Sequence, residues 1–143
     1  MRPIIFLCLL ASPLLAQAPK RQPVVLTDWS IYATYPDWRP GSDAIVFSTH
    51  DLEEFQATDE PSNVFTMNPD GSGLTALTTF GKAEQRATQP TWTPDGSRII
   101  FTLVGQQAGM DNPRHAAFID ADGSNIVDIG VDATHPRLRR SAP

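Results

Sequence analysis

A tetrapeptide recurs three times along this chain and sets its organisation. "ATYP" stands at 33–36, "ATQP" at 87–90 and "ATHP" at 133–136. The first two copies continue in parallel as "YPDWRPGSDAIVF" at 35–47 and "QPTWTPDGSRIIF" at 89–101, at a constant offset of 54 residues. A repeat of this length indicates a supersecondary unit that buries its apolar face against the next unit. We therefore expect a modular fold.

A second pair of matching blocks completes each unit. "VFTMNPDGSGLTAL" at 64–77 aligns with "AAFIDADGSNIVDI" at 116–129. In the second unit, the turn sequences "PDGS" at 94–97 and "DGS" at 122–124 separate short apolar segments, because proline presets φ and glycine accepts a positive φ. The pattern predicts strands around Trp92, at Arg98–Thr102, at Ala117–Asp120 and at Ile126–Ile129. Each unit is expected to be a four-stranded antiparallel sheet.

The stretch "PTWTPDGSRIIF" at 90–101, with the later "DGS", resembles the WD40-like PD40 repeat. That repeat forms the β-propellers of TolB-like envelope proteins and of prolyl-oligopeptidase-like enzymes. The resemblance implies an all-β fold, an incomplete β-propeller with two four-stranded antiparallel PD40-type blades plus flanking strands. Closure of a propeller ordinarily takes four or more blades.

The repeat also fixes the expected boundaries. We assign 1–18 to a signal peptide, 19–32 to an N-terminal segment with a possible outer strand at 24–27, 33–86 to blade 1 and 87–132 to blade 2. Residues 133–143 are expected to be the start of a third, truncated repeat whose inner strand would be 134–138.

The first eighteen residues have the pattern of a cleavable secretory signal. Arg2 precedes an almost wholly apolar run from Ile4 to Leu15, and Ala16-Gln17-Ala18 is a small-x-small cleavage site. Cleavage would remove Cys8, which is the only cysteine. The pattern predicts a periplasmic or secreted protein. The formal net charge of −5 argues against nucleic acid as a partner, and contact with a membrane is expected to be peripheral at most.

Aromatic residues and prolines recur at matching positions of the two units. We expect the side chains at these positions to form the repeat core, with the tryptophans filling the gap between blades. The residues are Trp38, Trp92, Phe47, Phe101, Pro36 and Pro90.

The sequence contains no catalytic nucleophile motif and no phosphate-binding glycine loop. We expect no catalytic residue, no cofactor and no metal. "DADGSN" at 120–125 offers Asp120, Asp122 and Asn125 as calcium ligands, but a hairpin turn is the favoured interpretation, because Val131 stands where an EF-hand needs glutamate. His50, His115 and His135 fall at three different repeat positions, which argues against a shared metal site.

A loop in the first unit is strongly acidic. Asp51, Glu53, Glu54, Asp59 and Glu60 occur there without a basic residue. We consider two roles for them, a protein-binding surface and an ordinary solvated loop.

These observations predict a non-catalytic exported module that binds or scaffolds an envelope protein. Two alternatives remain open at this stage: the propeller portion of a prolyl-oligopeptidase-like peptidase system, and a truncated gene product without independent function. Two blades leave blade faces without neighbours, so a homo-oligomer that completes the propeller is a further expectation.

Overall fold

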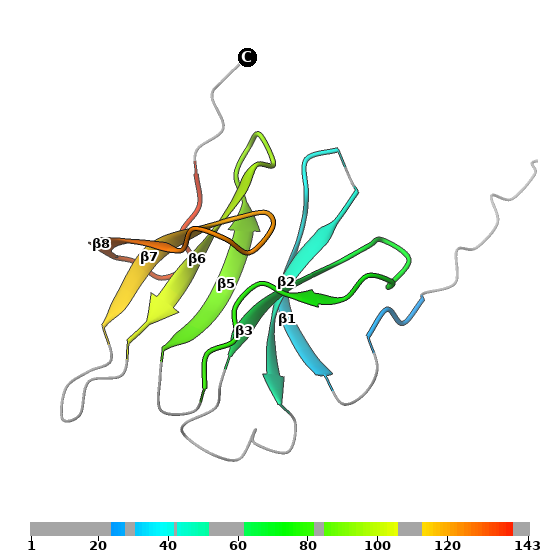
Figure 1. Ribbon diagram of the computed structural model, residues 1–143, viewed down its shortest axis with the longest axis horizontal. Coiled ribbons are helices and arrows are strands. Elements are labelled where there is room, and N and C mark those ends of the chain that lie inside the picture. Colours follow the sequence, from blue (N-terminus) through cyan, green and yellow to red (C-terminus); the bar gives the residue numbers. More distant parts are fainter. Residues whose placement is uncertain are drawn as a thin grey trace, which may run out of the picture.

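The computed structural model describes residues 24–27, 31–41, 43–51, 62–81, 85–105 and 113–138. The signal peptide prediction, most of the acidic loop and the side chains of His50 and Asp51 lie outside the described residues. Within them, eight strands form two four-stranded antiparallel sheets, each in simple up-and-down order (Figure 1). Blade 1 consists of β1 (Ile31–Trp38), β2 (Ile45–Asp51), β3 (Asn63–Met67) and β4 (Thr75–Ala76), and blade 2 of β5 (Arg86–Trp92), β6 (Arg98–Val104), β7 (Arg114–Asp120) and β8 (Val127–Asp132).

The Asp-Gly-Ser turns form as the sequence predicts. Gly123 has φ of +87°, and its N–H donates to the carbonyl of Asp120 at 2.9 Å. The Asp122 carboxylate accepts hydrogen bonds from the backbone N–H and the hydroxyl of Ser124. Because glycine adopts a positive φ without a Cβ clash, the chain reverses here and β8 pairs with β7.

The first strand of each blade is interrupted at the "AT-x-P" tetrapeptide. Pairing of β1 with β2 shifts register between Thr34 and Asp37, and pairing of β5 with β6 shifts between Thr88 and Thr91. Proline has no N–H to donate to a ladder, so a bulge is the natural conformation at this point. The repeated proline therefore places the same irregularity in both blades.

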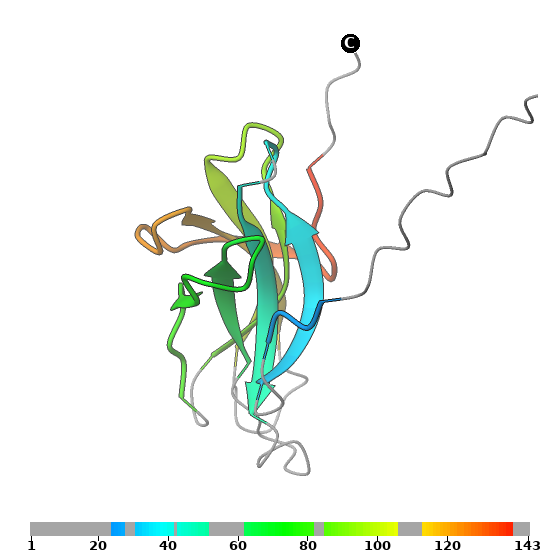
Figure 2. The same ribbon diagram turned by 90° about the vertical axis from the view of Figure 1, so that its right-hand side faces the viewer.

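The two blades pack face to face, with β5 against β1, β2 and β3 of blade 1 (Figure 2). Side chains from both sheets form one buried apolar cluster between them. Its members include Val46, Val64 and Leu77 from blade 1, and Trp92, Ile99, Phe101 and Ile119 from blade 2.

Four of the six residues predicted to form the repeat core are buried. Trp92, Pro90, Phe47 and Phe101 are buried. Trp38 and Pro36 are exposed, and for these two the prediction was wrong. The physical reason is position in the stack: blade 1 covers the Trp92 face of blade 2, whereas the corresponding face of blade 1 points away from blade 2.

The two flanking segments form no strands. Residues 24–27 and 134–138 are described without sheet pairing, contrary to the expected outer and inner strands. Leu26 nevertheless packs on Ile45, Phe47 and Met67 at the open side of blade 1. Figure 2 shows this segment lying across the first sheet. Among the described residues, no helix is long and apolar enough to cross a membrane.

Candidate binding site at the converging first strands

The variable residue of each "AT-x-P" tetrapeptide has a left-handed backbone. φ is +53° at Tyr35, +57° at Gln89 and +54° at His135. Among the described residues, only one other non-glycine residue, Asn125 in a hairpin turn, has a positive φ. Such a conformation costs an L-residue roughly 1–2 kcal/mol, and a following proline restricts the residue further. The strain recurs at one position of three successive repeats.

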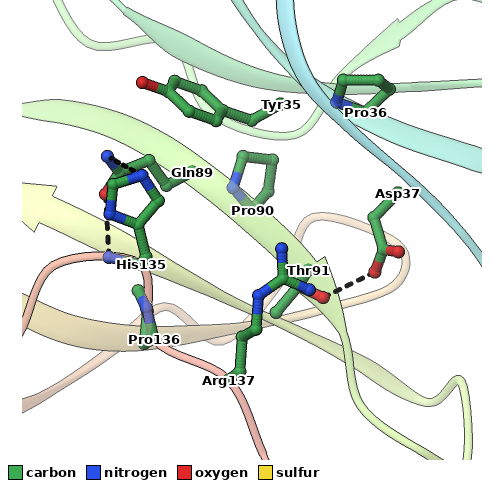
Figure 3. A pocket seen from close by; sticks show the side chains of 9 residues that line it. All are labelled: Tyr35, Pro36, Asp37, Gln89, Pro90, Thr91, His135, Pro136 and Arg137. Carbon is green, nitrogen blue, oxygen red and sulfur yellow. Dashed lines mark hydrogen bonds between the residues drawn. The ribbon is translucent and has the colours of Figure 1, made fainter.

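These three residues come together in space. The side-chain amide nitrogen of Gln89 lies 2.9 Å from Nε2 of His135, and Oε1 of Gln89 accepts a hydrogen bond from the backbone N–H of His135 at 2.9 Å. The rings of Tyr35 and His135 meet edge to face, with centroids 5.6 Å apart. Figure 3 shows the three side chains facing one another. Residues 46 and 100 positions apart in the chain thus share one site.

The hydrogen bonds of Gln89 indicate that a ring nitrogen of His135 is an acceptor. Oε1 of Gln89 is the acceptor for both the His135 N–H and the Thr102 hydroxyl, so the other end of the amide is the donor. An amide N–H can donate only to a ring nitrogen that carries no proton. In this arrangement Nε2 of His135 is the acceptor of the hydrogen bond from Gln89.

A hollow of about 50 Å³ lies beside these residues. Its wall combines three prolines with polar side chains from all three repeats (Figure 3). The lining residues are Tyr35, Pro36, Asp37, Gln89, Pro90, Thr91, His135, Pro136 and Arg137. Since pockets for drug-sized ligands occupy ~300–1,000 Å³, this hollow can accept one small group of a larger partner.

Asp37 anchors the site between the blades. Its Oδ2 accepts hydrogen bonds from the hydroxyl of Thr91 at 2.6 Å and from the backbone N–H of Trp92 at 2.9 Å. Arg39 adds a second link, because its Nε donates to the carbonyl of Gly96 at 2.9 Å and its guanidinium lies 5.1 Å from the centre of the Trp92 ring. These contacts link the two blades next to the site.

The "DADGSN" segment forms a hairpin turn whose polar groups bond to one another. Asp120 accepts from the Asn125 side-chain amide at 2.7 Å, and Asp122 accepts from Ser124. The Ser124 hydroxyl is the main reason that the pKa of Asp122 is lowered. Among the described residues, no three His, Cys, Asp or Glu side chains converge in a way that could hold a metal ion.

His115 and His135 lie in different surroundings. His115 on β7 bonds through Nδ1 to Asp128 on β8 at 3.0 Å, and this bond raises the pKa of His115. His135 belongs to the first-strand site. The acidic loop prediction stays a prediction, because its side chains and that of His50 lie outside the described residues.

Comparison with known proteins supports the fold. No family model and no curated protein matches the chain. Among solved structures, it is similar to "Oligogalacturonate lyase in complex with manganese", with a TM-score of 0.50 and 20% identity over 68% of this chain and 24% of that one. It is also similar to "Crystal structure of TolB from Acinetobacter baumannii", with a TM-score of 0.39 and 13% identity over 76% and 36% of the two chains. The chain spans less than two fifths of the length of either protein.

The two sheets are propeller blades. In a propeller, the first strand of every blade lies nearest the central axis. We name the hollow between β1, β5 and the opening of the third repeat, where Tyr35, Gln89 and His135 lie, the axial site.

The sequence contained an unused signal for this site. The tetrapeptide keeps Ala, Thr and Pro in three copies and changes only the third residue. A repeated proline within a strand indicates a bulge, and the side chain before it is set apart from the sheet. As a marker of the repeat, the tetrapeptide alone does not single out Tyr35, Gln89 or Arg137 as site residues.

Proposed function

We propose that this chain is a non-catalytic propeller module that binds a protein in the cell envelope through its axial site. One observation carries the proposal: three repeats hold the same strained backbone at the same position and present three different side chains, Tyr35, Gln89 and His135. Backbone strain of this kind persists where the surrounding structure enforces it, and it concentrates at functional sites. A constant scaffold with varied side chains is the usual design of a binding surface.

The chemistry of the site favours recognition over catalysis. Gln89 is held by Thr102 and His135, and the Thr91 hydroxyl donates to Asp37, a carboxylate that also fixes the Trp92 backbone. These bonds serve to position the blades. Tyr35, 46% exposed, and Arg137, also exposed, provide an aromatic face and a positive charge to a partner. Tyrosine and arginine are enriched at the energetic centres of protein interfaces.

Glycine substitution tests the site without disturbing its scaffold. Tyr35→Gly and His135→Gly remove the side chains while glycine readily keeps a positive φ. A photocrosslinking amino acid at position 35 of the tagged protein should capture a discrete envelope protein. Capture should fall at least tenfold when His135→Gly is introduced beside the crosslinker, and should persist in Leu74→Asp, an exposed apolar position away from the site. Equal capture by all variants would contradict the axial site.

The envelope location has its own test. The full chain expressed in a Gram-negative host should be recovered from the periplasmic fraction, with an N-terminus near residue 17 or 19 by intact mass. A cytoplasmic product that still carries Met1 would contradict export and leave the axial site untouched.

A further inference from the structure

The side of blade 1 that faces away from blade 2 carries the same apolar set that blade 2 buries. We name this side the open face and define it by Trp38, Ile45, Phe47, Phe65 and Met67, which lie opposite one another across β1, β2 and β3. Their repeat equivalents in blade 2 are Trp92, Ile99, Phe101, Ala117 and Ile119. All five equivalents belong to the buried cluster between the blades.

The two equivalent tryptophans, Trp92 and Trp38, differ in how much of each side chain is exposed. Trp92 is 6% exposed beneath Arg39 of blade 1, whereas Trp38 is 51% exposed. Ile45, Phe47 and Met67 are already buried with Leu26 packed against them, so Trp38 is the part of the open face that remains exposed.

Leu26 indicates what kind of group belongs on this face. In blade 2, a Cβ on Gly123 would lie 3.4 Å from the carbonyl oxygen of Leu77 in blade 1. In blade 1, a Cβ on the equivalent Gly71 would lie 2.9 Å from the carbonyl oxygen of Leu26. Leu26 thus takes the place on the open face that Leu77, at the outer strand of a neighbouring blade, takes on blade 2. The face already accepts an aliphatic residue in the position where a further blade would present one.

The complementary half of this contact is exposed at the other end of the molecule. Leu77 is buried at 7%, while its repeat equivalent in blade 2, Ile129 on β8, is 44% exposed. One end of the two-blade stack therefore displays the tryptophan side of a blade interface, and the other end displays the aliphatic side.

We propose that the open face binds a second copy of this chain, head to tail, with the Ile129 side of one blade 2 on the Trp38 side of the next blade 1. The observed contact between blades 1 and 2 provides the template. Such a heterologous contact closes into a ring when the rotation permits. At the Ile129 end this contact competes with the axial site, because the docked copy takes the place of residues 133–138, which hold His135 against Gln89.

The contact between copies is weaker than the one within the chain. Thr91 and Thr93 of blade 2 stand where blade 1 has Asp37 and Arg39, so the carboxylate and guanidinium links have no counterpart. Docking also moves two short segments, 24–27 on one copy and 133–138 on the other. Neither segment forms a strand. Displacing 133–138 breaks the bond from the Ala133 N–H to the Arg114 carbonyl and the bonds between His135 and Gln89. Association should accordingly depend on protein concentration in the micromolar range.

Two variants, one at each end, test this geometry. Sedimentation velocity of the purified chain should show a discrete dimer or larger ring that grows with concentration. Trp38→Asp and Ile129→Asp each remove one half of the contact, so each alone should be monomeric. An equimolar mixture of the two should form a 1:1 dimer and nothing larger, because one intact face remains on each. Leu74→Asp, at a similarly exposed apolar residue, should associate as the unmodified chain does.

Three results would contradict the proposal or its geometry. An unmodified chain that stays monomeric at 100 µM overturns the proposal, as does polydisperse material that neither aspartate changes. A mixture that stays monomeric while the unmodified chain associates overturns the head-to-tail geometry. Circular dichroism checks that both variants fold, and Trp38→Gln with Ile129→Gln repeats the test if either aspartate variant does not.

Discussion

Asp37 and Thr91 occupy the same position in successive repeats, and the hydroxyl of Thr91 donates a hydrogen bond of 2.6 Å to the carboxylate of Asp37. Two residues that are 54 positions apart in the sequence are thus in contact in the fold. Since the same carboxylate accepts the Trp92 N–H, one side chain of blade 1 fixes the start of the turn that follows β5. The blade stack depends on this clamp as well as on the apolar cluster.

Removal of the clamp should destabilise the protein. Asp37→Ala leaves the Trp92 N–H and the buried Thr91 hydroxyl without their acceptor, a loss that costs about 1–3 kcal/mol. Urea unfolding provides the free energy of unfolding. The control is Asp43→Ala, which breaks only the exposed pair with Arg39 at 3.5 Å and should cost less than about 1 kcal/mol. Equal losses in both variants would contradict the clamp.

The two repeat tryptophans should differ sharply in their contribution to stability. Trp92→Ala removes a ring buried between blades and should cost about 3–5 kcal/mol. Trp38→Ala removes a half-exposed ring and should cost about 1 kcal/mol, measured on dilute, monomeric protein. Similar values for the two would mean that Trp38 is covered after all.

Much of this fold is predictable from the sequence because the repeat carries it. The Asp-Gly-Ser turns and the apolar run "IIF" at 99–101 specify β6 to β8 locally, and equivalence extends the prediction to blade 1. Equivalence is also where prediction fails. It assigns Trp38 and Trp92 the same environment, yet burial depends on which neighbour a blade has.

The axial site required the three-dimensional structure for a different reason. A left-handed φ at Tyr35 and Gln89 has no local residue preference behind it, because neither is among the residue types enriched at positive φ. The bulge imposed by the following proline sets the conformation, and the convergence of the first strands brings the side chains together. Neither effect is visible in a single copy of the tetrapeptide.

Position 35 should prefer glycine to alanine. Both changes remove the ring, but alanine retains a Cβ at φ of +53°, whereas glycine does not. Tyr35→Gly should therefore be more stable than Tyr35→Ala by about 1 kcal/mol, after the greater backbone entropy of glycine is set against the relieved strain. Melting of the two variants under identical conditions measures the difference. A more stable alanine variant would show that the left-handed backbone is not populated.

The pair His115 and Asp128 should make stability depend on pH near neutrality. The hydrogen bond to Asp128 raises the pKa of His115 above 6.5, with further help from the charges of Asp128 and Asp132. A raised pKa means that the stabilising contribution is complete below pH 6.5 and is lost as the pH rises through the folded-state value. Because the pair is exposed, the effect should be small. The difference in Tm between the unmodified chain and Asp128→Asn should shrink from pH 6 to pH 8, and an NMR titration of His115 should give a pKa above 6.5.

Asp95 should produce a separate loss of stability in acid. The Thr93 hydroxyl, followed by the backbone and hydroxyl of Ser97, lowers the pKa of Asp95 to about 2. A lowered pKa means that the contribution is present above pH 3.8 and disappears as the pH falls toward 2, because the unfolded chain then binds the proton more readily. Asp95→Asn keeps the size of the side chain and lacks this titration. The urea midpoint of the unmodified chain should therefore exceed that of Asp95→Asn at pH 6, and the gap should close by pH 2. The control is Asp43→Asn, outside the turn, whose gap relative to the unmodified chain should stay smaller at every pH. A gap for Asp95→Asn that persists unchanged at pH 2 would show that the turn does not depend on the charged carboxylate.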